Sequence, residues 1–162
     1  MKSKMTRRPE GMSLYCRVIQ PEDLQQILDL ENKKLAETYP DEMERMIATW
    51  NSKFRVEALN HYIALGWSFL AEEQGTNKLM GYFIAQPLLF LDGQTQTLWV
   101  EHVQYNSLQA RDELCELAYK LGREKHLQRV YFPNDNGVPN SVKAFKAESW
   151  QPGTLSVKTT KG

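Results

Sequence analysis

The segment that follows residues 98–103 brings together features that could bind a phosphate. A run rich in apolar and aromatic residues stops at Val103, and a helical pattern of apolar residues begins at once and continues to Gly122. The free N–H groups and the dipole at such a helix start together make an anion site. The first turns lack the glycines that allow close approach of backbone to phosphate. The sequence therefore leaves open whether this helix start holds a phosphorylated cofactor.

Length and charge limit the classes of function. A chain of 162 residues is the size of one ordinary domain, and 20 basic and 20 acidic residues give a formal net charge of zero. Nothing global draws such a chain to nucleic acid or to an anionic membrane. We expect residues 14–162 to form a single domain, residues 1–13 to form a mobile tail, and the partner to be a small molecule or a protein.

Cysteines, histidines and hydropathy exclude further classes. Cys16 and Cys115 lack the paired spacing of a zinc or disulfide framework, which predicts two buried free thiols. His61, His102 and His126 lack a two-histidine helical spacing, so no metal site is expected. No stretch approaches the roughly 20 apolar residues of a membrane span, and the basic start lacks the apolar segment of a secretory signal. A cytoplasmic location is expected.

The first third of the chain predicts a strand and then helices. Alternating apolar residues end at Ile19, and Pro21 suits a first helical position. Asp41 precedes Glu44 at capping-box spacing. The second helix carries large apolar side chains at the three-and-four spacing of a buried stripe, and we assign that stripe to the core: Met43, Met46, Ile47, Trp50 and Phe54.

Three strands follow, over residues 67–73, 78–91 and 94–103. The first two are joined around Gly75, and Asp92-Gly93 between the last two predicts a two-residue hairpin. Pro87 would break a ladder hydrogen bond, so it should mark a bulge or an edge.

The remaining elements complete a crossover unit. The helix that begins after residue 103 leads to a strand at 127–133, and a strand–helix–strand crossover makes the two strands parallel. A loop over 134–140, a short helix over 141–149 and a final extended segment over 154–159 follow. The predicted order is strand, two helices, three antiparallel strands, helix, strand, helix, strand.

Several local phrases stand in this order. They are "CRVIQPEDLQQILDL", "NKLMGYFIAQ" with Gly81, "LCELAYKLGREKHLQRVYF" and "AFKAESW". From Tyr15 to Lys158 the chain thus resembles the GNAT superfamily of acyl-CoA-dependent N-acyltransferases. The resemblance implies an α/β fold (an α+β mixed sheet) of order β-α-α-β-β-β-α-β-α-β. Its fourth and fifth strands, near 98–103 and 129–132, would be parallel and splayed into a V-shaped cleft.

The resemblance also implies a reaction. It would move an acetyl or other acyl group from acetyl-CoA or a related acyl-CoA to a small-molecule or protein amine, without a metal. The pantetheine arm would lie in the cleft and the pyrophosphate at the helix start. The family's loop of Arg or Gln, then Gly, then Gly or Ala falls on Asn106, Gln109 and Arg111, and all three depart from it. The residues implied to contact CoA are Val103, Asn106, Leu108, Gln109, Ala110, Arg111 and Phe145.

The departures have a chemical meaning. Asn106 and Gln109 have nearly capping-box spacing, so the helix could satisfy its own first N–H groups. Asp112 and Glu113 favour the helix while repelling phosphate, whereas Arg111 could supply a charged fork. These residues therefore leave open whether the chain binds CoA.

The acid and base of the reaction are also open. Glu101 or His102, at the end of the fourth strand, could act as base for the amine, or either could be a solvated or core side chain. The family often protonates the departing thiolate with a tyrosine, and the matching position is Phe145, which has no proton to give. Either water or a nearby tyrosine assists, or acyl transfer is lost. A catalytically silent module of the same fold that binds a ligand or protein is the alternative function, and a homodimer is as open as a monomer.

Overall fold

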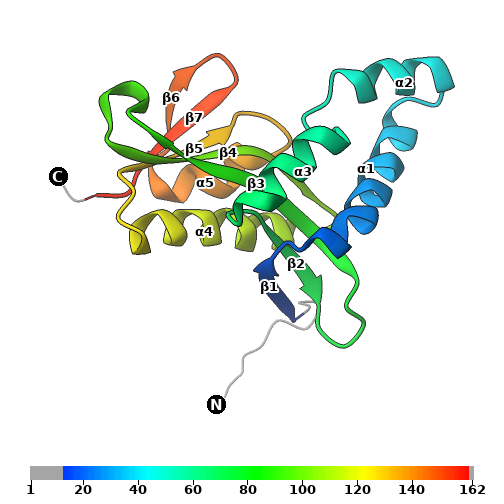
Figure 1. The fold of residues 1–162 in the computed structure, drawn as a ribbon, viewed down its shortest axis with the longest axis horizontal. Coiled ribbons are helices and arrows are strands. Elements are labelled where there is room, and N and C mark those ends of the chain that lie inside the picture. Colours follow the sequence, from blue (N-terminus) through cyan, green and yellow to red (C-terminus); the bar gives the residue numbers. More distant parts are fainter. Residues whose placement is uncertain (1–12, 161–162) are drawn as a thin grey trace.

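The computed structural model describes residues 13–160, so the predicted tail, except for Ser13, lies outside the described residues. The helices and strands in chain order are β1 (Leu14–Val18), α1 (Leu24–Thr38), α2 (Glu42–Trp50), α3 (Val56–Leu65), β2 (Phe69–Glu73), β3 (Leu79–Leu89), β4 (Gln96–Tyr105), α4 (Leu108–Glu124), β5 (Arg129–Pro133), α5 (Val138–Val142), β6 (Glu148–Gln151) and β7 (Thr154–Lys158). The strands form one sheet of order β1-β2-β3-β4-β5-β7-β6 (Figure 1).

The sheet is mixed, as predicted. β4 and β5 pair in parallel, and all other neighbours pair antiparallel. The parallel pairing covers only residues 97–99 of β4 and 129–131 of β5. β4 then continues along β3 to Tyr105, while β5 continues along β7 to Pro133. The predicted fold class, with its fourth and fifth strands parallel and parting, is confirmed.

Helices cover the two faces of the sheet (Figure 1). α1 and α3 pack on one face, and α4 and α5 pack on the other. Successive residues of β3 serve the two layers in turn, as the two-residue period of a strand requires. Tyr82 and Ile84 join the core under α1 and α3, whereas Phe83 and Ala85 join the core under α4. The contacts of a β4 side chain likewise show whether it faces α1 and α3 or faces α4.

Gly81 allows three elements to approach closely. A Cβ atom at this position would lie 2.9 Å from the Gln104 carbonyl oxygen and 3.0 Å from Leu114 Cδ1. Any side chain here would push β3 away from β4 or from α4. The glycine that the resemblance singled out thus has a packing reason.

The predicted core stripe of the second helix is wrong for four of its five residues. Met43, Met46, Ile47 and Trp50 are 59%, 44%, 49% and 63% exposed, and only Phe54 is buried. The capping of α2 by Asp41 is confirmed, since its carboxylate accepts from Glu44 N–H at 3.0 Å.

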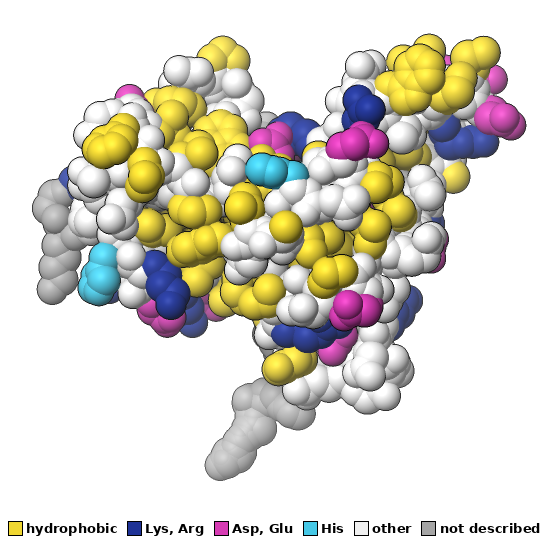
Figure 2. Space-filling view, viewed as in Figure 1, with side chains coloured by type: hydrophobic (Ala, Val, Ile, Leu, Met, Phe, Trp, Pro, Cys, Tyr) yellow, Lys and Arg dark blue, Asp and Glu magenta, His cyan; other side chains and the backbone are white. Residues whose placement is uncertain are grey.

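The side chains of α2 are exposed because a third helix, which the pattern did not predict, covers the sheet instead. α2 packs beside α1 at one end of the molecule, away from the sheet, and its apolar side chains form a surface patch there (Figures 1 and 2). α3 instead covers β3, with Leu59, Tyr62 and Ile63 buried. Helical spacing identified an apolar face without showing which helix lies over the sheet.

The β3–β4 connection is longer than the predicted two-residue hairpin. The last paired residues are Leu89 and Gln96, and Asp92-Gly93 lies in a 3-10 turn between them. The two residues do have the left-handed φ values that favoured a turn, 52° and 74°. Pro87 lies beyond the point where β2 stops pairing with β3, at Phe83, so the prediction of an edge position is confirmed.

The end of the chain differs from the predicted helix over 141–149. α5 begins earlier, after Gly137, and a 3-10 turn at Lys143–Phe145 ends at Lys146, whose φ is 61°. A left-handed residue stops a helix. Residues 148–151 therefore form β6, which pairs with β7 and which the pattern missed.

The two cysteines are free thiols, as predicted, but they differ in burial. Cys115 is buried in α4, and burial raises its pKa to about 12. Cys16 is half-buried, and its pKa is raised to about 11, chiefly by burial. Neither thiol forms an appreciable amount of thiolate near neutral pH.

Candidate active site

A bulge in β4 presents Glu101 and His102 on the same layer. Ile84 pairs with His102 and its neighbour Ala85 pairs with Val100, so Glu101 is the extra residue of the bulge. An extra residue re-aims the side chains beside it. The contacts of both side chains are with elements of the α1 and α3 layer. Glu101 lies two residues beyond Trp99, where the pairing of β4 with β5 ends.

Glu101 keeps one carboxylate oxygen engaged. Oε1 accepts from Tyr62 O–H at 3.1 Å and from Trp99 Nε1–H at 2.8 Å. Burial, together with the charge of Glu101, raises the pKa of Tyr62 to about 12, so its hydroxyl remains a donor near neutral pH. Within residues 13–160, no hydrogen bond to Oε2 of Glu101 is present. That oxygen can accept from the ammonium or amine of an acceptor.

His102 lies against a buried carboxylate of α1. Its Nε2 is 2.8 Å from Oε2 of Glu31, a side chain that is 1% exposed. Tyr82 O–H donates to the same oxygen, and Gln104 Nε2–H donates to Oε1 at 3.2 Å. Both candidate bases thus lie side by side on β4 but in different surroundings.

The start of α4 is capped by the chain itself. Ser107 is the N-cap, and its hydroxyl accepts from Ala110 N–H at 3.1 Å. The predicted cap from Asn106 and Gln109 is therefore displaced by one residue. The Asn106 amide donates to the Leu79 carbonyl at 3.4 Å, and the Gln109 amide donates to Glu113 at 2.8 Å. The backbone N–H of Ala110, which could bind phosphate at this helix start, is therefore already paired.

Arg111 is held between α4 and the segment that leads into α5. Its guanidinium donates to Ser141 Oγ at 2.7 Å and to Asp112 at 3.2 Å, and it lies 5.6 Å from the centre of the Tyr105 ring. Arg111 is 9% exposed. A Cβ atom on Gly137 would lie 2.8 Å from its Nη1. The side chain fills space beside the helix start and is not a free charge.

The loop after β5 reaches back to the edge of β4. Asn136, in a left-handed conformation, donates its amide to the Val103 carbonyl at 2.8 Å and accepts at its own carbonyl from Tyr105 O–H at 2.9 Å. The end of β4 beyond the bulge is therefore tied to this loop. Of the other residues implied to contact CoA, Val103 and Ala110 are buried and Leu108 is exposed.

Phe145, which the resemblance matches to the family's tyrosine, packs against another aromatic ring. Its ring stacks on Tyr119 of α4 with centroids 4.3 Å apart. Tyr119 lies eleven residues into α4 from Leu108, about 16 Å along the axis at the usual rise. The left-handed Lys146, one residue later, ends the helical segment. Phe145 thus packs as an aromatic anchor on the C-terminal half of α4.

The sequence interpretation missed Glu31, Tyr82, Gln104 and Tyr62. A signal for Glu31 exists, because it follows the buried Ile27 by four residues and so falls on the core face of α1. A carboxylate on a core face needs donors. Nothing in the linear sequence shows that these donors come from β3 and β4.

The comparisons with solved structures identify the fold. No protein-family model and no curated protein matches the sequence. A GNAT-family acetyltransferase from Listeria monocytogenes superimposes with a TM-score of 0.63 over 91% of this chain and 95% of its own, at 18% identity. The PaiA N-acetyltransferase of Thermoplasma acidophilum, in complex with coenzyme A, gives 0.63 over 93% and 100%, at 16% identity. A GNAT-family acetyltransferase of Brucella melitensis, in complex with acetyl-CoA, gives 0.62 over 93% and 91%, at 15% identity.

These matches and the parting of β4 from β5 define the fold as that of the GNAT acetyltransferases, which confirms the fold that the resemblance implied. In this chain α4 is capped by Ser107, and the buried Arg111 stands where the resemblance implied a glycine or alanine.

Two further findings limit the chemistry of the described residues. No group of three or more histidine, cysteine, aspartate or glutamate side chains between residues 13 and 160 could hold a metal ion. None of the helices described is both long and apolar enough to cross a membrane.

Proposed function

We propose that the protein is an N-acyltransferase that moves an acetyl or related acyl group from acyl-CoA to an amine. The observation that carries the proposal is the bulge at Glu101, which lies directly beyond the last β4–β5 pair and presents two proton acceptors on one layer. The surface is hollowed between α2 and the β6–β7 hairpin (Figure 2). Solved structures of the same fold contain CoA and acetyl-CoA.

The residues divide the work as follows. A bound acyl-CoA supplies the thioester carbonyl. The second oxygen of Glu101 binds the amine, because two donors keep the first oxygen engaged. Either Glu101 or His102 takes the amine proton, so that the nitrogen lone pair can form the new C–N bond. With no hydroxyl at Phe145, the departing thiolate takes its proton from water or from a base that has just been protonated.

The test combines binding with turnover. Calorimetry with acetyl-CoA measures the first substrate, and release of free thiol measures transfer to agmatine, 2-phenylethylamine and Nα-blocked lysine, which represent cationic, aromatic and protein-like amines. We expect turnover with at least one amine and its loss in Glu101→Gln. Binding without turnover by any amine would contradict the proposal.

A catalytically silent module remains the second candidate, favoured by the capped start of α4 and the buried Arg111. These features reduce the number of free donors for a pyrophosphate. Absence of binding at millimolar CoA would favour this candidate over the enzyme.

A further inference from the structure

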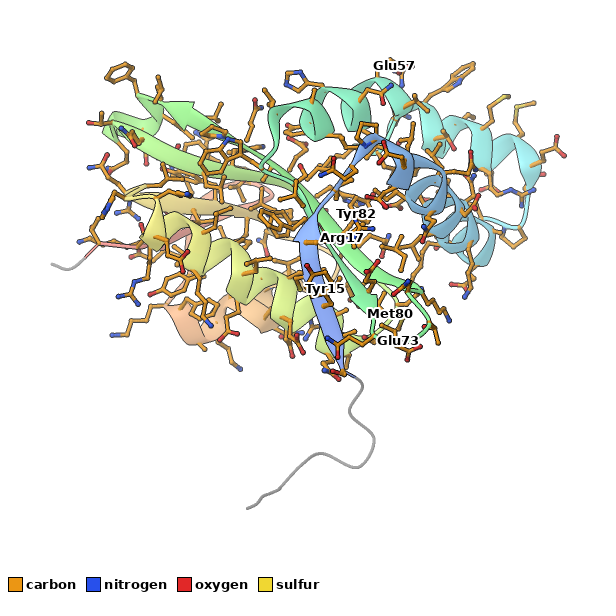
Figure 3. The ribbon with its side chains drawn as sticks, turned by 60° about the horizontal axis from the view of Figure 1, so that its bottom comes forward. Tyr15, Arg17, Glu57, Glu73, Met80 and Tyr82 are labelled. Carbon is orange, nitrogen blue, oxygen red and sulfur yellow. The ribbon has the colours of Figure 1, made fainter. Side chains whose placement is uncertain are left out.

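Glu31 is a carboxylate inside the protein, near the middle of α1. A buried charge without partners is very costly, so such a carboxylate requires donors. Three groups surround it: the Tyr82 hydroxyl and His102 Nε2 at Oε2, and the Gln104 amide at Oε1. Figure 3 shows Tyr82 on β3, on the side of the sheet that α1 covers. The question is which of these groups must donate.

The orientation of Gln104 is fixed by its other end. Its Oε1 accepts from Tyr105 N–H at 3.1 Å and from the Asn136 amide at 3.3 Å. A backbone N–H can only donate, so the oxygen of Gln104 faces Tyr105 and its NH₂ faces Glu31. Burial raises the pKa of Tyr82 well above its ordinary value, and the charge of Glu31 adds to this, so Tyr82 stays protonated and donates as well.

The third group beside Glu31, Nε2 of His102, determines the tautomer of the imidazole. A carboxylate only accepts, so Nε2 of His102 must carry a hydrogen to bond Oε2. A neutral imidazole has one N–H, which leaves the lone pair on Nδ1. Among residues 13–160, Nδ1 has no hydrogen-bond partner, and the side chain of His102 is 15% exposed.

We propose that Glu31 is a positioning residue that holds His102 with its proton on Nε2, so that Nδ1 is the base for the acceptor amine. This inference rests on the proposed acyl transfer. Glu101 then binds the amine, and Nδ1 takes one proton from its nitrogen. The C–N bond forms, the C–S bond breaks, and the proton leaves Nδ1 for the thiolate directly or through water, giving the amide and free CoA thiol.

The groups that face the imidazole are few. They are Glu31 from α1, Tyr82 from β3 with ring centroids 5.9 Å apart, the Phe54 ring at 6.0 Å, and Glu101 next in sequence, with Tyr62 of α3 bonded to Glu101. Apart from Glu31, no anion in this set is hydrogen-bonded to the ring. The tautomer of His102 therefore depends chiefly on one carboxylate.

Glu31→Gln is the informative change because it keeps the shape and replaces Oε2. Gln104 donates at the Oε1 position, so we expect the oxygen of the new amide to lie there and its NH₂ to face His102 and the Tyr82 oxygen, which then accepts where it donated before. An NH₂ group donates to Nε2, and the imidazole hydrogen must then move to Nδ1. The variant should be folded but have the wrong tautomer, an effect that a carboxylate beside a catalytic histidine is known to control.

The first measurement is independent of activity. Long-range ¹H–¹⁵N spectra of protein labelled at its three histidines, recorded at about pH 9, distinguish the two tautomers. His102→Asn assigns the signal. We expect Nε2–H in the wild type and Nδ1–H in Glu31→Gln. Tyr82→Phe, which leaves the carboxylate in place, should keep Nε2–H.

The second measurement is steady-state kinetics with acetyl-CoA and the best amine of the three. Glu31→Gln should lower kcat about 100-fold, within the usual range for a lost proton acceptor, with KM for acetyl-CoA changed less than about two-fold. Asp23→Asn is the matched control, since Asp23 is another buried carboxylate, bonded to Arg17 and not to His102. It should leave both the tautomer and kcat unchanged.

The results separate this inference from the proposed function. A wild-type imidazole with Nδ1–H, a Glu31→Gln imidazole that keeps Nε2–H, or a tautomer change without loss of kcat overturns the inference, even if the protein is an active enzyme. No turnover by the wild type with any amine contradicts the proposed function and the base role with it. In that case the spectra still show whether Glu31 fixes the ring.

Discussion

The two sides of the β4 bulge differ in how they are built. On the α1 and α3 side, Glu101 and His102 are surrounded by donors and a carboxylate that fix their geometry. On the α4 side, Ser107 and Arg111 satisfy the helix start and fill the space beside it. The groups that would handle an amine are pre-organised, whereas those that would handle a pyrophosphate are engaged with the protein itself.

The difference teaches that the two halves of the candidate site are satisfied by the protein to different degrees. Hydrogen bonds to Glu101 and Glu31 contribute to the fold whether or not a substrate binds, so they persist as structure. The predictions below test each half.

The largest effect is expected at the bulge. Glu101→Gln removes the charge that binds the amine, and His102→Asn removes the imidazole that takes its proton. Each should lower kcat/KM about 10²- to 10⁴-fold. Stopped-time thiol release measures the loss, and calorimetry with acetyl-CoA should give unchanged binding. If either variant keeps wild-type turnover, that residue is structural and the contrast between the two halves is weaker than described.

Arg111→Ala tests the other half, because the resemblance implies a glycine or alanine at this position. If the guanidinium fills the cofactor path, its removal should tighten CoA binding about 10-fold, worth about 1.4 kcal/mol. The Ser141–Asp112 hydrogen bond of 2.6 Å can remain. Arg123→Ala, near the other end of α4, is the control with no expected change.

The opposite result for Arg111 is equally informative. Weaker CoA binding in Arg111→Ala, together with wild-type binding that falls with salt, would mean that the guanidinium turns to the phosphates. The α4 side would then be a rebuilt cofactor site.

The features that the sequence predicted depend on interactions between neighbouring residues, and the features that it missed depend on contacts between distant ones. Strand and helix order came from local periodicity, the parallel pair followed from that order, and Gly81 was singled out by the resemblance. α2 was misassigned because an apolar helical face does not name the surface it covers, and Trp50 is 63% exposed. Glu101 and His102 were identified from their place at the end of a strand.

The partners of these two residues were beyond a linear interpretation. Glu31 and Gln104 are 73 residues apart, and their contact depends on how α1 crosses β3 and β4. The predicted helix over 141–149 was wrong for a related reason, since the left-handed residue Lys146 ends the helical segment that the pattern extended.

Tyr62→Phe tests a smaller part of the amine side. It removes one of two donors to Glu101 Oε1 and should raise KM for the amine about five-fold, close to the usual net value of one hydrogen bond. Because the pKa of Tyr62 is raised to about 12, its hydroxyl stays protonated at pH 7 and at pH 10. The KM ratio of variant to wild type should therefore be the same at about pH 7 and about pH 10. A ratio that approaches one at the higher pH would show that Tyr62 ionises within this range.

Ser107→Gly should have the smallest effect on the fold and a specific effect on the ligand. Glycine is tolerated at an N-cap, so the free energy of unfolding should fall by only a few tenths of a kcal/mol. The change frees the Ala110 N–H, which the Ser107 hydroxyl now satisfies at 3.1 Å, and gives the helix start a donor for an anion. CoA should bind slightly more tightly, and the gain should add to that of Arg111→Ala if cap and guanidinium obstruct the site independently. Calorimetry on the two single variants and the double variant measures this. A double variant no better than wild type would show that the α4 side is closed by more than these two side chains, with the Asn136–Val103 hydrogen bond as the next group to remove.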